Sequence, residues 1–260
     1  MSDLVERSQW LRRQVFEMST RVLQGHLASV LSEVEILVSL YYGGVLNCNP
    51  DDPNRDRVII SKGHATMGLY PILADLGYFP VSELDNYGKY DGMLRLFGNI
   101  DIPGIDATTG SLGHGVGIAC GYCIAAKRDK KPALTFVILS EGEMYEGSVW
   151  ESALFASHNN LDNLTVILDR NRKIILGDTE NLTRLEPVNR KWESFGWETY
   201  TVNGHSHDEL LSALNAESIK PKVIIANTTK GKGISFMEGR SEWHYTNLND
   251  RLIDIARKEL

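Results

Sequence analysis

Two polar clusters follow apolar segments that are typical of buried strands. Glu141 comes two positions after the run 135–139, and Asn171 comes three positions after the run 165–168. Their thirty-position separation is about the length of a βαβ crossover, and a right-handed crossover would bring both side chains to one edge of a sheet. Carboxylate and amide oxygens suit Mg²⁺ or Ca²⁺, and magnesium usually completes its coordination with phosphate oxygens. The pair therefore predicts a site for a metal and a diphosphate.

Glycines next to these clusters favour the same interpretation. Gly142 would let the backbone approach a diphosphate, and a helix from about Ser148 would point its first amides towards it. Acidic glycine-rich turns between a strand and a helix are also common without any ligand, so the prediction depends on Asn171 as the partner of Glu141. A second glycine-rich stretch, 108–115, fails the G-x-G-x-x-G pattern because the third glycine would fall at Ile118, which disfavours NAD.

Histidines could supply proton transfer near neutral pH. His26, His64 and His244 fall at the edges of expected strands and loops, where a sugar-processing site needs hydrogen-bond donors and acceptors. Each of them, taken alone, could equally be a surface or structural residue. We expect His205 and His207 to cap a helix or to face solvent.

The three cysteines do not predict a disulfide framework. Cys120 and Cys123 form a Cys-x-x-Cys, which could be a redox pair or half of a zinc site. They lie, however, within the small, apolar segment 115–126, and no second cysteine pair with zinc spacing accompanies them. We interpret both as small buried hydrophobic residues.

The elements that must position these residues follow from hydrophobic periodicity. The pattern predicts helices at 4–22, 28–42, 65–76, 115–127, 149–159, 188–195 and 207–216, and strands at 57–61, 134–139, 164–168, 198–202 and 222–227. Residues 82–109 are expected to form a long loop or several short pieces. Strands that alternate with helices predict an α/β fold, a mainly parallel sheet with helices on both faces. With no linker or repeat in the sequence, we expect residues 1–260 to form a single domain.

Composition excludes several classes of function. A chain of 260 residues with 42% hydrophobic and 23% charged residues is typical of a packed globular protein. The net charge of −7 gives no basic surface for nucleic acid. No apolar run reaches the ~18 residues of a membrane span, and the first residues lack the apolar core of a signal peptide. We therefore expect a cytoplasmic protein with neither nucleic-acid nor membrane partners.

As a set, these motifs resemble the N-terminal, diphosphate-binding half of transketolase, a thiamine-diphosphate enzyme. The resemblance covers nearly the whole chain and rests on Gln24-Gly25-His26, Ser61-Lys62-Gly63-His64, Pro103-Gly104, the stretch 108–115, Glu141-Gly142, Glu146-Gly147, Asn171, Lys230-Gly231-Lys232-Gly233-Ile234 and Trp243-His244. It implies the thiamin diphosphate-binding fold. It also implies the first subunit of a two-chain transketolase, which moves a two-carbon ketol unit from a ketose to an aldehyde.

The resemblance implies a role for each matching residue. The metal, Mg²⁺ or Ca²⁺, would be held by Glu141, Asn171 and the main-chain carbonyl of Lys173. Thiamine diphosphate would contact His64, Gly110, Ser111, Leu112, Gly142, Asn171 and His244. His26 and His64 would act on the sugar substrates, and Glu146 would link two active sites. The implied partner is a second subunit with the pyrimidine-binding and C-terminal domains, in a heterotetramer.

Three departures from the family pattern keep alternatives open. The family has an aspartate at the position of Glu141, and it has a Gly-His-Pro where 94–99 contains no histidine. Tyr245 stands where a glycine usually follows the match to His244, and the expected Ala-Pro is missing. Two alternatives fit these changes: other thiamine-diphosphate carbon–carbon chemistry in specialised metabolism, or a non-catalytic binding subunit.

Overall fold

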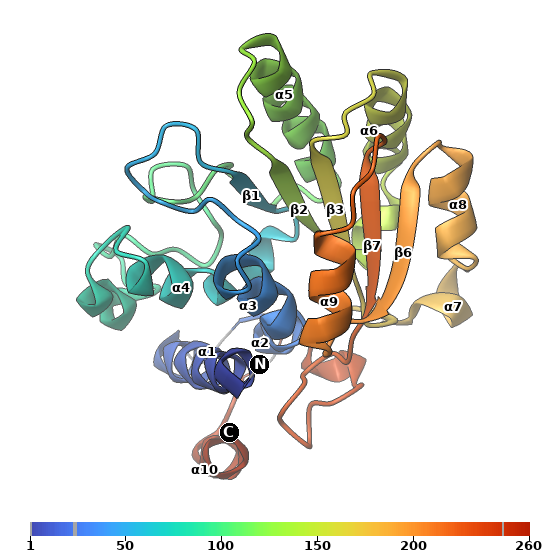
Figure 1. Ribbon diagram of the computed structural model, residues 1–260. Coiled ribbons are helices and arrows are strands. Elements are labelled where there is room, and N and C mark those ends of the chain that lie inside the picture. The colour runs from blue at the N-terminus through green and yellow to red at the C-terminus, as the bar shows by residue number, and fades with distance from the viewer. Residues whose placement is uncertain (1, 23–24, 246) are drawn as a thin grey trace.

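A five-stranded sheet forms the centre of the molecule, in the spatial order β1-β2-β3-β7-β6 (Figure 1). The computed structural model describes residues 2–22, 25–245 and 247–260. The strands are β1 (Arg57–Ile60), β2 (Thr135–Ser140), β3 (Leu164–Arg170), β6 (Glu198–Asn203) and β7 (Lys222–Asn227). All four pairings are parallel, so the carboxyl ends of the strands share one edge. A separate antiparallel pair joins β4 (Lys173–Ile174) to β5 (Gly177–Asp178).

Helices cover both faces of the sheet. They are α1 (Ser2–Val22), α2 (Leu27–Leu31), α3 (Val34–Tyr42), α4 (Tyr70–Asp75), α5 (Gly115–Arg128), α6 (Gly147–His158), α7 (Thr179–Leu182), α8 (Val188–Ser194), α9 (His207–Leu214) and α10 (Asp250–Glu259). Four 3-10 turns accompany them: η1 (Gly63–Gly68), η2 (Val81–Asn86), η3 (Glu141–Tyr145) and η4 (Ser241–Trp243). Within the described ranges, no helix is long and apolar enough to cross a membrane.

Two hydrophobic cores lie on opposite faces because side chains alternate along each strand. In β2, Phe136 and Ile138 join the core under α1–α4 and α9, whereas Val137 and Leu139 join the core under α5, α6 and α8. Figure 1 shows these two helix layers on either side of the sheet. The prediction of a mainly parallel sheet covered on both faces is therefore confirmed, and each strand begins and ends within two residues of its predicted limits.

Two predicted helices are each divided in the structure. The predicted helix 28–42 is interrupted between α2 and α3, where the Ser32 hydroxyl donates to Asp169 Oδ2 at 2.6 Å. The adjacent Glu33 turns inward and forms an ion pair with Lys62. The predicted helix 65–76 is a 3-10 turn followed by α4, which begins next to Pro71. Tertiary polar contacts thus override the continuous helical pattern at the first of these positions.

The interpretation of the cysteines is confirmed. Cys120 and Cys123 are free thiols buried on α5. Burial raises the pKa of Cys120 to about 12 and that of Cys123 to about 11, so neither is a thiolate near neutral pH.

The prediction for His205 and His207 is wrong. The residue that caps α9 is Ser206, whose side chain accepts from the Glu209 amide. His207 is only 8% exposed, and its ring nitrogens lie 3.1 Å from Ser8 Oγ and 2.8 Å from Ser39 Oγ. His205 Nε2 accepts from the Thr229 amide at 2.8 Å, so Nδ1 carries the proton and donates to Glu35 at 2.9 Å. His205 therefore connects α3 with the loops beyond β6 and β7, and His207 connects α1 and α3 with the first residue of α9.

Candidate active site

A cavity of about 350 Å³ lies beyond the carboxyl ends of β1, β2 and β3. Ligands of parallel α/β sheets bind at this edge. Most of the predicted site residues line this one cavity: His26, His64, Gly110, Leu112, Glu141, Gly142, Asn171, Lys173 and His244. Ser29, Lys62 and Lys230 also line it, although the sequence pattern predicted no role for them.

Three imidazoles gather at one end of the cavity. The ring centroids of His26 and His64 are 4.6 Å apart, and that of His244 lies 5.2 Å from His26 and 5.5 Å from His64. Burial and the nearby Lys230 ammonium lower the pKa of His26 to about 4 and that of His244 to about 3. Burial likewise lowers the pKa of His64 well below its usual value. All three rings are therefore neutral near pH 7 and can each donate and accept a hydrogen bond.

Buried charges form the floor of the cavity. Lys62 Nζ lies 2.5 Å from Asp169 Oδ2 and 3.0 Å from Glu33 Oε2. Lys230 Nζ donates to Ser29 Oγ at 3.0 Å and lies 3.2 Å from His244 Nδ1. Burial lowers the pKa of Lys230 to about 8. The signal that could have identified Lys62 and Asp169 is the one used for Glu141, since each lies at or just after the end of an apolar strand.

Glu141 and Asn171 line the same cavity, as the sequence predicted, but each also contacts a neighbour. Glu141 Oε2 accepts from Arg170 Nη1, whereas the buried Oε1 has no hydrogen-bond partner in the described part of the chain. Burial raises the pKa of Glu141 to about 7. Asn171 Oδ1 accepts from the Lys173 amide at 3.1 Å.

These residues fit a divalent cation. The unpartnered Glu141 oxygen and the second lone pair of the Asn171 amide oxygen are hard donors of the type that Mg²⁺ and Ca²⁺ prefer. No group of three or more His, Cys, Asp or Glu residues within 2–22, 25–245 and 247–260 is arranged to hold a metal. A cation here would therefore need further oxygens, such as those of a diphosphate.

Glycines allow neighbouring segments to pack closely next to the cavity. A Cβ on Gly142 would lie 3.3 Å from Ile174, and one on Gly63 would lie 2.8 Å from the backbone at Thr109 and Gly110. The Glu143 carboxylate accepts from the Gly113 amide at 3.0 Å and the Ser140 amide at 2.8 Å. The Glu143 carboxylate thus ties the turn at Gly113 to the end of β2.

Some predicted features do not meet at the cavity. Ser111 and Glu146 are exposed and do not line it, and Gln24 lies outside the described residues. The predicted approach of the α6 N-terminus is not observed. Instead, the turn η3 separates β2 from α6, and Gly142 and Tyr145 of that turn line the cavity.

Two aromatic side chains, Phe97 and Tyr245, occupy positions where this sequence differs from the family pattern. Phe97 lines the cavity, with its ring centroid 6.4 Å from that of His26. The Tyr245 ring also contacts His26, with a distance of 4.9 Å between the two ring centroids. The histidine cluster therefore has aromatic neighbours.

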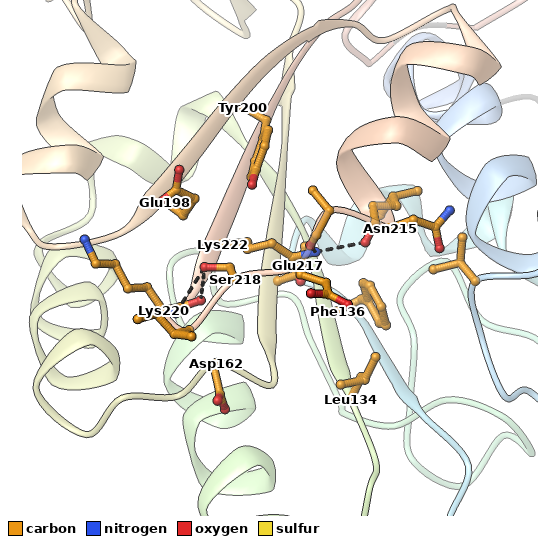
Figure 2. A pocket seen from close by; sticks show the side chains of 15 residues that line it. Leu134, Phe136, Asp162, Glu198, Tyr200, Asn215, Glu217, Ser218, Lys220 and Lys222 are labelled. Carbon is orange, nitrogen blue, oxygen red and sulfur yellow. Dashed lines mark hydrogen bonds between the residues drawn. The ribbon is translucent and has the colours of Figure 1, made fainter.

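A larger hollow, of about 860 Å³, lies at the opposite edge of the sheet (Figure 2). It lies at the amino ends of β2, β3, β6 and β7 and includes Phe136, Tyr200 and Lys222. Lys222 Nζ donates to the carbonyls of Leu214 and Ala216, each at 2.8 Å, and so caps the C-terminus of α9. The buried cation has a structural role here, so size alone does not make this hollow the active site.

The parallel sheet and the cavity beyond its carboxyl edge, with three clustered histidines, are typical of a cofactor-binding α/β domain. The chain belongs to the family "Transketolase, thiamine diphosphate binding domain", whose model matches residues 9–260.

Similar proteins include subunits of transketolases. The chain is 40% identical to a subunit of the apulose-4-phosphate transketolase of Actinobacillus succinogenes, over 99% of this chain and 96% of the relative. It is 38% identical to the 6-deoxy-6-sulfo-D-fructose transketolase subunit SqwG of a Clostridium species, with the same coverage. The fold matches the transketolase of Campylobacter jejuni with a TM-score of 0.94 and 32% identity. That match covers all of this chain but 43% of the longer enzyme.

Proposed function

We propose that this chain is the N-terminal subunit of a two-chain transketolase that depends on thiamine diphosphate and Mg²⁺ or Ca²⁺. It would transfer a two-carbon ketol unit from a ketose to an aldehyde acceptor in the cytoplasm. The observation that carries the proposal is that one cavity contains both features. It is lined by the neutral histidine cluster and by the buried carboxylate of Glu141, one oxygen of which has no hydrogen-bond partner among the described residues. The names of the similar subunits support the same activity.

Two groups of residues are proposed to hold the cofactor, one at its metal–diphosphate end and the other at its thiamine end. Glu141, Asn171 and the carbonyl of Lys173 would hold the metal, and Gly142 would lie against the diphosphate. Gly110 and Leu112, which line the cavity, would contact the thiamine, together with His64 and His244. When bound, thiamine diphosphate supplies the electron sink that carbon–carbon bond cleavage needs.

The chain's own contribution to the reaction would come from its neutral imidazoles. Lys230 Nζ donates to His244 Nδ1, so the His244 proton is on Nε2, which can donate to a sugar oxygen. His26 and His64 would orient hydroxyl groups and move protons between them. Exclusion of water by the buried surroundings would strengthen each of these hydrogen bonds.

A second subunit would complete the active site. We propose that it carries the pyrimidine-binding and C-terminal domains, and that two pairs assemble as a heterotetramer. Glu146, which is exposed before α6, would link the two active sites across the interface.

Activity and calorimetry test the proposal together. The isolated chain should give no ketol transfer over a panel of ketose donors and aldehyde acceptors, and addition of the partner subunit should restore it. Turnover by the isolated chain would contradict the two-subunit proposal. Cofactor binding by the pair without ketol transfer would favour other thiamine-diphosphate chemistry. Absence of binding at millimolar thiamine diphosphate and Mg²⁺ would favour a non-catalytic subunit.

A further inference from the structure

Arg170, the last residue of β3, is a buried cation at the centre of a network of ion pairs. It is 1% exposed. Because side chains alternate along a strand, Asp169 points to the Lys62 side of the sheet and Arg170 points to the other. The sequence pattern predicted no role for Arg170.

One arm of the guanidinium contacts the proposed metal ligand. Arg170 Nη1 donates to Glu141 Oε2 and to Thr179 Oγ1, the second at 3.0 Å. The other carboxylate oxygen of Glu141 stays without a partner among the described residues. The guanidinium thus occupies one oxygen of the carboxylate and leaves the other available.

The second arm holds the segment that follows β3. Arg170 Nη2 donates to Glu180 Oε1 at 2.7 Å and to Glu186 Oε1 at 3.1 Å. Glu180 in turn accepts from the backbone amides of Leu185 and Glu186, and Glu186 accepts from that of Val188. These contacts close the segment 173–186 around one buried cation.

The same segment forms part of the cavity. Lys173, Ile174 and Ile175 line it, although Ile175 is 63% exposed. The segment has little apolar burial of its own at this point, so its position depends on polar contacts. Arg170 therefore connects the carboxylate of Glu141 with the part of the cavity wall contributed by 173–175.

We propose that Arg170 is a positioning residue that orients Glu141 for the metal and holds the segment 173–186 over the bound cofactor. The inference rests on the proposed function. Glutamate has one more rotatable bond than the aspartate usual in this family, and fixing Oε2 on a planar guanidinium removes that freedom. The positive charge also offsets part of the cost of burying the Glu141 carboxylate.

The test compares Mg²⁺ binding and backbone protection in the full chain paired with its partner subunit. Calorimetry with saturating thiamine diphosphate gives the Mg²⁺ affinity, and hydrogen–deuterium exchange with and without cofactor gives the protection of 173–186. The variants are Arg170→Met and Arg170→Lys, with Glu180→Gln to remove the loop contact alone. Arg190→Met is the matched control, because it removes an exposed Arg–Glu pair on α8.

We expect Arg170→Met to weaken Mg²⁺ binding about 10- to 100-fold, the usual effect of losing a partner of a metal ligand. Hydrogen exchange in 173–186 should become faster. Arg170→Lys should have an intermediate effect on Mg²⁺ affinity and on exchange, because a lysine keeps the charge but cannot contact Glu141 and Glu180 with two separate nitrogens. Glu180→Gln should also make hydrogen exchange in 173–186 faster, but it should weaken Mg²⁺ binding less than Arg170→Met does. In a Glu141→Asp background, whose shorter side chain loses the Arg170 contact, the effect of Arg170→Met should shrink.

Unchanged Mg²⁺ affinity and unchanged exchange in folded Arg170→Lys and Glu180→Gln proteins would overturn the inference, even if Arg170→Met does not fold. A wild-type pair that binds no thiamine diphosphate would overturn the proposed function instead. The exchange of 173–186 without cofactor would then decide the role of Arg170 by itself.

Discussion

Lys62 and Asp169 form an ion pair of 2.5 Å whose side chains are 2% and 0% exposed. Lys62 follows β1 and Asp169 lies near the end of β3, so the pair spans the carboxyl end of β2, which lies between those strands. Ser32 and Thr228 donate further hydrogen bonds to the Asp169 carboxylate. The Asp169 carboxylate is therefore held by several hydrogen bonds, and the floor of the cavity is charged rather than apolar.

Asp169→Asn should strongly destabilise the fold. Removing one charge of a buried pair leaves the other without full compensation, which usually costs about 3–5 kcal/mol. The free energy of unfolding in urea measures this cost. The matched control is Asp162→Asn, which breaks the half-exposed pair with Lys127 and should cost at most about 1 kcal/mol. Equal costs for the two variants would mean that the buried network adds no stability.

Two glycines of α5 should respond in opposite directions to alanine. A Cβ on Gly115 would lie far inside van der Waals distance of Ser61 Oγ, so Gly115→Ala should destabilise the chain by about 1–3 kcal/mol through overpacking. Ser61 also donates to Glu143, which holds the turn at Gly113, so thiamine diphosphate binding should weaken as well.

Gly121 is the control because a Cβ there meets nothing within 4 Å. Gly121→Ala should leave stability unchanged or raise it by up to about 1 kcal/mol through helix propensity. Urea unfolding and cofactor calorimetry of both variants check the prediction. A Gly115→Ala protein as stable as wild type would show that Ser61 moves aside without cost.

Stability should depend on pH through His244. Its pKa is about 3 in the folded chain, because burial and Lys230 disfavour the cation, against an ordinary 6.5 when unfolded. Below pH 6.5 the unfolded chain binds a proton at this ring and the folded chain does not. The contribution of His244 to stability is therefore lost as the pH falls below 6.5 and is constant above that value. His244→Asn removes this effect and keeps an acceptor for Lys230.

The difference in unfolding free energy between wild type and His244→Asn isolates the contribution of His244. Glu33, whose pKa burial raises to about 7, acts in the opposite direction but is common to both proteins. We expect the advantage of wild type to decrease as the pH falls from 6.5 towards the folded-state pKa of about 3, with a slope below one proton because the ring is partly exposed. A difference independent of pH would contradict the neutral, buried state of this ring.

The positions of the strands and of the cavity could be predicted because both follow from local patterns. Four of the five strands of the parallel sheet, β1, β2, β3 and β7, contain short apolar runs, and residues just after such runs lie at the ligand-binding edge of a parallel sheet. Glu141 and Asn171 were found in this way. The same rule predicts site positions for Lys62, which follows β1, and for Asp169, which lies near the end of β3.

Contacts between distant segments could not be predicted. The break after Ser32 depends on Asp169, which is 137 positions away, and the burial of His207 depends on Ser8, which is 199 positions away. The Arg170 contact with Glu141 needs the relative rotation of two neighbouring strand ends, which periodicity does not give. Local propensity cannot determine structure at such positions because the tertiary partner decides the conformation.

The aromatic side chains around His26 should determine which sugars react. Phe97 and Tyr245 both pack on the His26 ring, at centroid distances of 6.4 and 4.9 Å. An aromatic contact of this type is worth about 0.5–1.5 kcal/mol. Phe97→Ala and Tyr245→Gly should therefore each raise the KM for the preferred ketose by up to about tenfold. Affinity for thiamine diphosphate should change little in Tyr245→Gly, and somewhat more in Phe97→Ala because the Phe97 ring lies next to Gly110.

Tyr90→Ala is the matched control for these two variants. Tyr90 belongs to the same irregular segment as Phe97, is 97% exposed and does not line the cavity. Steady-state kinetics of the chain with its partner, together with cofactor calorimetry, separate the two effects. A loss of thiamine diphosphate affinity with an unchanged KM would instead assign Phe97 and Tyr245 to the cofactor side of the cavity. An altered ranking of ketose donors in Tyr245→Gly would show that this ring, which replaces the glycine usual in the family, sets the choice of sugar.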